Sequence, residues 1–222
     1  MRNTNAIFIK QLRSFFKKPA IIGQVAMLLV MAAVFSILVQ DVPSYAFTTI
    51  FSIMFVGLAM VGTTSSFIIE DRATMNLRFM AMAGVRPHQY LIGTGGALLL
   101  VSFGTLAIFS LIGRYSGMYI LIFLGITMIG ATASILLGTT LSLTKFPWLS
   151  GPFSMILGFA PMISDTNESV ERIFRFLYTQ QINTAIRNLS GDHTQAIQII
   201  LVNMAVILAV FIWMHKKNGL NG

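Results

Sequence analysis

Six runs without a formal charge constrain this chain more than any other feature of its sequence. The runs are 19–40, 42–69, 87–113, 115–144, 146–164 and 193–215, and the shortest has 19 residues. A helix needs about 20 apolar residues to cross the hydrocarbon core of a bilayer. Each run therefore predicts a membrane-spanning helix, although Pro147, Pro152 and Pro161 interrupt the fifth.

The composition agrees with this interpretation. Hydrophobic residues make up 55% of the 222 residues and charged residues only 10%, against roughly 25% charged residues in soluble domains. The sequence thus predicts an all-α integral membrane protein, with one transmembrane domain over 1–222. The expected spans lie at about 20–40, 46–69, 90–113, 118–143, 147–164 and 196–214.

Amphipathic helices are expected outside the spans. Segment 4–18 places apolar residues on one side of a helix and basic residues on the other, which predicts an elbow helix in the headgroup plane. Its membrane-interface residues are Phe8, Leu12, Arg13, Phe15, Phe16 and Lys17. A second polar stretch, 166–190, predicts short amphipathic helices on the outer face before span six.

The distribution of Lys and Arg predicts the orientation in the membrane. With the amino terminus inside, eleven of these residues fall on inner segments and four on outer segments. Positive residues favour the cytoplasmic side, so both termini and the loop 70–89 are expected in the cytoplasm of a multi-pass cell-membrane protein. The net charge of +8 then indicates contact with membrane lipid rather than nucleic acid.

The loop 70–89 is unusual for a simple connection. It begins with two acids and carries three arginines, and between them apolar residues recur at helical spacing. Gly84 can end such a helix and Pro87 prevents its continuation. A short apolar helix just outside the bilayer predicts a separate cytoplasmic partner.

Several classes of chemistry are not indicated by the sequence. There is no cysteine and no G-x-x-x-x-G-K-[ST] motif, and the three histidines stand at span edges outside any metal motif. We therefore expect no catalytic residue, no metal ligand and no cofactor on this chain. The spans also lack central ionisable residues, which ion-coupled transporters use, so energy for transport would have to arrive from outside the bilayer.

Residues 68–93, IIEDRATMNLRFMAMAGVRPHQYLIG, resemble the coupling-helix region of permease subunits of type-two ATP-binding-cassette exporters. The basic stretch 9–20, with its proline, is similar to the elbow of that family. The resemblance implies a coupling helix between spans two and three, a partner ATPase that carries ATP and Mg, and a second permease copy or paralogue. The implied coupling residues are Glu70, Asp71, Arg72, Thr74, Met75, Leu77, Arg78, Phe79, Met80 and Arg86.

The function expected from these features is export of an amphipathic or hydrophobic substrate, such as a peptide, a drug or a lipid-linked molecule. The expected substrate path is Thr48, Phe51, Phe55, Phe153 and Phe159. The alternative is the substrate-binding membrane subunit of a vitamin importer, which also has six spans. An intramembrane enzyme is a third interpretation, but it would need paired carboxylates or histidines within the spans.

Overall fold

The protein is all-helical in a computed structural model that describes residues 2–39, 41–144, 146–164, 168–189, 191 and 193–218. No strand occurs among these residues. The elements are α1 (Arg2–Lys17), α2 (Pro19–Leu38), α3 (Ser44–Met54), η1 (Phe55–Met60), α4 (Val61–Ala73), α5 (Asn76–Met82), α6 (Pro87–Ile112), α7 (Met118–Ser142), η2 (Pro147–Leu149), α8 (Ser150–Ser164), α9 (Glu168–Phe174), α10 (Tyr178–Arg187) and α11 (Thr194–Asn218).

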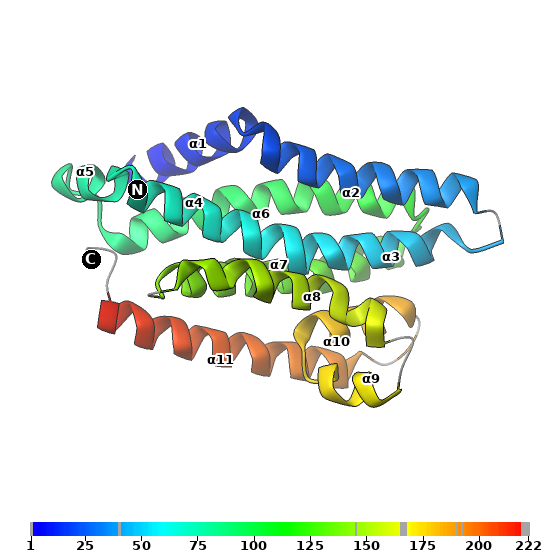
Figure 1. The fold of residues 1–222 in the computed structure, drawn as a ribbon. Helices are drawn as coiled ribbons and strands as arrows, with labels where there is room; N and C mark the ends of the chain where they lie inside the picture. The colour runs from blue at the N-terminus through cyan, green and yellow to red at the C-terminus, as the bar shows by residue number, and fades with distance from the viewer. Residues whose placement is uncertain are drawn as a thin grey trace.

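The long helices form an elongated bundle (Figure 1). Helices α2, α3 with α4, α6, α7, α8 and α11 run along its length. Helix α5 lies at one end, together with the start of α1 and the end of α11, whereas α9 and α10 lie at the opposite end. We call the first of these the α5 end and the second the α10 end.

Among the residues that the structure describes, five helices are long and apolar enough to cross a membrane: Pro19–Leu38, Ser44–Ala73, Pro87–Ile112, Met118–Ser142 and Thr194–Met214. The all-α class and the membrane character expected from the charge-free runs are thereby supported. The remaining expected span, 147–164, consists of a 3-10 turn followed by the 15-residue α8, and the count of six spans stays a prediction. Gln40, Thr166, Asn167 and Ser190, at the edges of expected segments, lie outside the described residues.

The helix formed by α3, η1 and α4 is the centre of the bundle. In its most apolar stretch, 67% of the residues are buried, and its middle is a π-helical segment, FVGLAM. A Cβ on Gly57 in this segment would lie 2.7 Å from the backbone carbonyl of Leu157 in α8, and a Cβ on Gly158 would lie 2.8 Å from Leu58. The two helices thus touch backbone to backbone, which only small residues permit.

Helix α1 packs against α6 along one stripe. Ile7, Gln11 and Phe15, spaced four residues apart, are buried, and a Cβ on Gly93 of α6 would lie 2.8 Å from Ile7 Cγ2. Among the predicted elbow residues, Phe8 and Leu12 are half-buried, whereas Arg13, Phe16 and Lys17 are exposed. Helix α1 ends at a bend, because Pro19 begins α2.

Candidate functional site at the α5 end

Three consecutive residues at the end of α4 connect it to different neighbours. Successive side chains on an α-helix are turned by about 100°, so Glu70, Asp71 and Arg72 point in three directions. Glu70 contacts the bend between α1 and α2, Asp71 contacts α1, α5 and α6, and Arg72 contacts the end of α7. The charged start of the loop thus joins most of the helices at this end.

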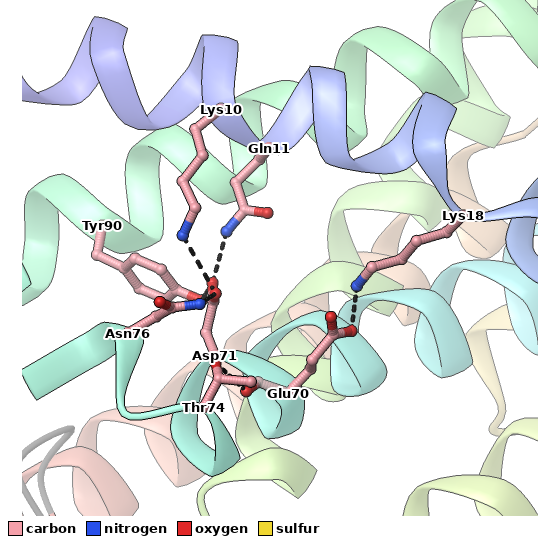
Figure 2. A network of polar contacts seen from close by, with 8 residues as sticks. All are labelled: Lys10, Gln11, Lys18, Glu70, Asp71, Thr74, Asn76 and Tyr90. Atoms are coloured by element: carbon pink, nitrogen blue, oxygen red, sulfur yellow. Dashed lines mark hydrogen bonds and ion pairs between the residues drawn. The ribbon is translucent and has the colours of Figure 1, made fainter.

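Asp71 is the hub of a polar network (Figure 2). Its Oδ2 accepts hydrogen bonds from Gln11 Nε2 at 2.7 Å and from Tyr90 Oη at 2.8 Å. Its Oδ1 accepts hydrogen bonds from Lys10 Nζ at 3.3 Å and from Asn76 Nδ2 at 3.2 Å. Four donors from three other helices therefore share one carboxylate, which is only 6% exposed.

Burial makes this network costly to break. An ionised carboxylate withdrawn from water needs hydrogen-bond donors or an opposite charge, and here Lys10 supplies the charge. The Lys10 side chain is 45% exposed, so its ammonium group stays partly hydrated. Gln11 and Tyr90, by contrast, are 3% and 2% exposed, and without Asp71 their donors would lose a buried partner.

The acids and bases on either side of Asp71 are less buried. Glu70 forms an ion pair with Lys18, whose ammonium group also lies 4.0 Å from the centre of the Phe67 ring. Arg72 Nη1 donates a hydrogen bond to the Ser142 carbonyl at 2.8 Å, where α7 ends. Arginine and lysine near the last carbonyls of a helix complement its negative end.

The backbone turns sharply on both sides of α5. Met75 has a φ of 56°, in the left-handed region that L-residues rarely adopt. The hydroxyl of Thr74 donates to the Glu70 carbonyl at 2.8 Å, and Met75 lies between the end of α4 and the first residue of α5. After α5, Gly84 has a φ of 78°, a conformation that glycine adopts without steric cost, and Pro87 begins α6.

Helix α5 is apolar on more than one side. Leu77 and Met80 face the bundle, where they pack against a buried cluster of Ile7, Ile68, Tyr90 and Leu143. Its other side is exposed, together with the turn before it. The exposed fractions are 58% for Met75, 61% for Phe79 and 69% for Met82. We call these three residues the α5 apolar face.

The structure thus divides the predicted coupling residues into two groups. Asp71 is buried and Leu77 and Met80 are half-buried against the bundle, whereas Met75 and Phe79 are exposed. Arg86 is exposed and precedes α6, and its backbone N–H donates to Gln89 Oε1 at 3.0 Å. The side chain of Arg78 lies outside the described portion of the chain.

The five residues of the predicted substrate path lie in two different surroundings, and the path itself stays a prediction. Thr48, Phe51 and Phe55 are buried in the core of the bundle, and the Thr48 hydroxyl donates to its own helix at the Ser44 carbonyl. Phe153 and Phe159, on α8, are 44% and 40% exposed. None of these five residues lines either of two surface hollows, one at the α10 end around Tyr115 and one between α1, α2 and α6 around Leu29.

A cavity of about 290 Å³ opens at the α10 end. Tyr45, Arg114, Tyr115 and Tyr119 contribute to its wall. Burial raises the pKa of the Tyr115 phenol, although its hydrogen bond with Thr49 opposes this effect. The wall of the cavity combines aromatic and basic residues with the apolar Ile186 and Leu189, and the α10 end lies far from the α5 end along the bundle (Figure 1).

Sequence reasoning missed the partners of Asp71. Gln11 stands in the apolar stripe of α1, four residues from both Ile7 and Phe15, and a polar residue in such a stripe is the one available signal for a buried hydrogen bond. Lys10 and Asn76 carry no comparable signal, because their proximity to Asp71 arises only from the packing of α1 and α5.

Among the residues that the structure describes, no group of three or more His, Cys, Asp or Glu side chains could hold a metal ion. In comparisons with protein-family models, curated proteins and solved structures, no match to this chain was found. The functional interpretation therefore depends on the residues themselves.

Proposed function

We propose that this chain is the membrane-spanning permease subunit of an ATP-driven exporter, coupled through the loop 70–89 to a separate cytoplasmic ATPase. The observation that carries the proposal is the α5 apolar face. Three large apolar side chains are exposed at the end of the bundle where α4 becomes charged. Lipid would cover them inside a bilayer, but a charged, polar end lies in water, where an exposed apolar cluster favours a protein partner.

The connections of α5 to the bundle support a mechanical role. Its first residue, Asn76, is bonded to Asp71, and Leu77 and Met80 are packed against α1, α6 and the segment after α7. A partner that displaces α5 would therefore move several spans together. The left-handed Met75 adds to this argument, since strained residues often occur at functional sites.

The lack of central charges in the spans supports an energy source outside the bilayer. In the described helices that could cross a membrane, the Asp, Glu, Lys and Arg residues stand near the helix ends, and the spans offer no central charge for ion coupling. ATP and Mg would be bound by the partner, and a second copy of the chain or a related chain would complete the transport path. The substrate class that fits uncharged Phe-, Met- and Thr-bearing spans is amphipathic or hydrophobic.

Site-specific photo-crosslinking tests the proposal. A benzophenone amino acid would be placed at Phe79 and, as a matched control, at Phe176, which is 70% exposed near α9 and α10. We expect residue 79 to crosslink to a protein that contains a phosphate-binding loop, and residue 176 to give no such product. Phe79→Glu should also remove most substrate-stimulated ATP hydrolysis from the purified complex, whereas Phe176→Glu should leave it unchanged.

Two results would count against the exporter assignment. Crosslinks from residue 79 only to lipid or to another copy of this chain would exclude an ATPase at the α5 apolar face. Tight binding of a vitamin by the isolated chain would instead favour the importer subunit. Membrane levels and size-exclusion profiles of the variants would separate these results from misfolding.

A further inference from the structure

The cavity at the α10 end lies at the turn between two helices that are long enough to cross a membrane. Helix α6 ends at Ile112 and α7 begins at Met118, so the turn 113–117 would stand at a bilayer surface, at the level of the headgroups. The wall comes from the start of α3, from this turn, from the start of α7 and from the end of α10. Its volume of about 290 Å³ is close to the lower end of the range of small-molecule sites.

The wall of this cavity carries two positive charges. Arg114 comes from the turn and Arg187 is the last residue of α10, and no Asp or Glu stands among the described residues of the wall. Arg114 is exposed, and within the part of the chain that the structure describes its guanidinium group has no ion pair or hydrogen bond. Arg187 Nε donates a hydrogen bond to Oδ1 of Asn183 at 3.0 Å, and Asn183 is only 2% exposed. Two guanidinium groups from different elements thus line one cavity, and one of them is anchored to a buried amide.

Three tyrosines form much of the remaining wall. Tyr115 is fixed, because its ring stacks on Phe123 with 4.8 Å between the centroids and its hydroxyl shares a hydrogen bond with Thr49 at 3.2 Å. Tyr45 and Tyr119 are 48% and 43% exposed, and their hydroxyls have no hydrogen-bond partner among the residues described here. A phenol can donate a hydrogen bond to a negatively charged oxygen, so both hydroxyls can add to the two cations.

Arg114 has a backbone conformation that favours glycine. Its φ is 55°, in the left-handed region that is sterically unfavourable for L-residues. In the same turn Gly117, with a φ of 57°, is the residue type expected for such a conformation. An arginine at position 114 therefore carries a steric cost that glycine would avoid, and strain of this kind often occurs at functional sites.

We propose that this cavity binds a phosphate group between Arg114 and Arg187. Arginine suits this role because its planar guanidinium group can donate two parallel hydrogen bonds to phosphate oxygens. A tetrahedral phosphate directs its charged oxygens to different sides, so it can bond both side chains at once. A lipid headgroup at the bilayer surface and a soluble phosphate ester both present this chemistry. The inference does not depend on the proposed transport function, which concerns the opposite end of the bundle (Figure 1).

Substitutions at position 114 separate binding from folding. Arg114→Gln removes the charge and keeps an L-residue in the left-handed conformation, whereas Arg114→Gly removes the charge together with the steric cost. Arg114→Gly should therefore fold at least as well as the native chain, which size-exclusion profiles and circular dichroism would check. Arg175→Gln is a matched control, because Arg175 is exposed next to α9, at the same end of the bundle, and does not line the cavity.

The test is native mass spectrometry of the full chain in detergent, in two arms. The lipid arm compares phosphatidylglycerol with diacylglycerol of identical acyl chains, and the soluble arm compares glycerol phosphate with glycerol. We expect binding that requires the phosphate in at least one arm. Arg114→Gln and Arg114→Gly should each weaken this binding about tenfold, because one charge-assisted contact is lost, whereas Arg175→Gln should leave it unchanged.

The two arms identify the source of the phosphate. Phosphate-dependent binding in the lipid arm alone would assign the cavity to a lipid headgroup, and binding in the soluble arm alone would assign it to a soluble ester. Binding in both arms would show that the phosphate itself is sufficient for recognition. The proposal would be overturned if neither arm showed a requirement for phosphate, if both Arg114 variants bound normally, or if Arg175→Gln weakened binding equally.

Discussion

Replacement of Asp71 by alanine should destabilise the protein by about 3–6 kcal/mol, because two buried donors would lose their charged acceptor. The structure explains why the loss is large. Gln11 and Tyr90, at 3% and 2% exposure, would keep buried donors without an acceptor, and each such loss at a charged partner costs about 1.5–3 kcal/mol. Lys10, with 45% of its side chain exposed, can turn to water and adds little.

The adjacent acid is a matched control. Glu70 stands on the same helix, but its side chain is 54% exposed and its ion pair is with Lys18 alone. Glu70→Gln should therefore cost less than about 1 kcal/mol. Unfolding by SDS in mixed micelles, followed by circular dichroism, would compare the two variants. In a thermal assay the difference should appear as about 2–4 °C per kcal/mol for a chain of this size.

A double-mutant cycle measures the interaction energy between Asp71 and Tyr90. Tyr90→Phe alone should cost about 1.5–3 kcal/mol, because Asp71 loses one hydrogen bond. In the Asp71→Ala background the same change should recover part of the loss, because it removes a buried hydroxyl that has no acceptor left. Equal losses for Asp71→Ala and Glu70→Gln, or an unchanged cost of Tyr90→Phe in both backgrounds, would refute the reasoning.

The remaining predictions concern the backbone. Gly57→Ala should lower the free energy of unfolding by about 1–3 kcal/mol through overpacking, because its Cβ would lie 2.7 Å from the Leu157 backbone. Gly62→Ala, whose Cβ would meet nothing within 4 Å, should raise it by about 0.5–1 kcal/mol. If SDS unfolding showed both variants to be stabilised or both destabilised, this packing would be contradicted. Met75→Gly should stabilise the chain by about 1 kcal/mol, because φ at this position is 56°, yet lower ATPase stimulation if the α5 apolar face binds a partner. A thermal scan that shows Met75→Gly to be destabilising would argue against strain there.

The long helices were predictable from the sequence because nothing competes with the hydrophobic signal in an apolar run. The range expected for the fourth span, 118–143, differs by one residue from Met118–Ser142. The fifth was harder, since Pro147 and Pro161 shorten its regular portion to α8. The π-helical segment could not be predicted, because its sequence, FVGLAM, is as apolar as the rest of the span and contains no helix-breaking proline.

The candidate site was only partly predictable. The apolar periodicity of 75–83 indicates a helix but cannot say which of its sides packs inward, because both carry Met and other large residues. That choice is made by the distant residues Ile7 and Leu143. The hub at Asp71 depends in the same way on a partner 60 positions away in the chain, a pairing fixed by tertiary packing alone.

The π-helical segment η1 sets the rotational phase of everything that follows it in the central helix. A π-helical turn holds about one residue more than an α-helical turn, and one residue corresponds to about 100° of rotation. Were η1 to rewind as an ordinary α-helix, α4 would twist about its axis and the carboxylate of Asp71 would swing away from Gln11 and Tyr90. The hydrogen bonds of Asp71 therefore depend on the π-helical segment in the core, which lies about 16–24 Å away along the same helix.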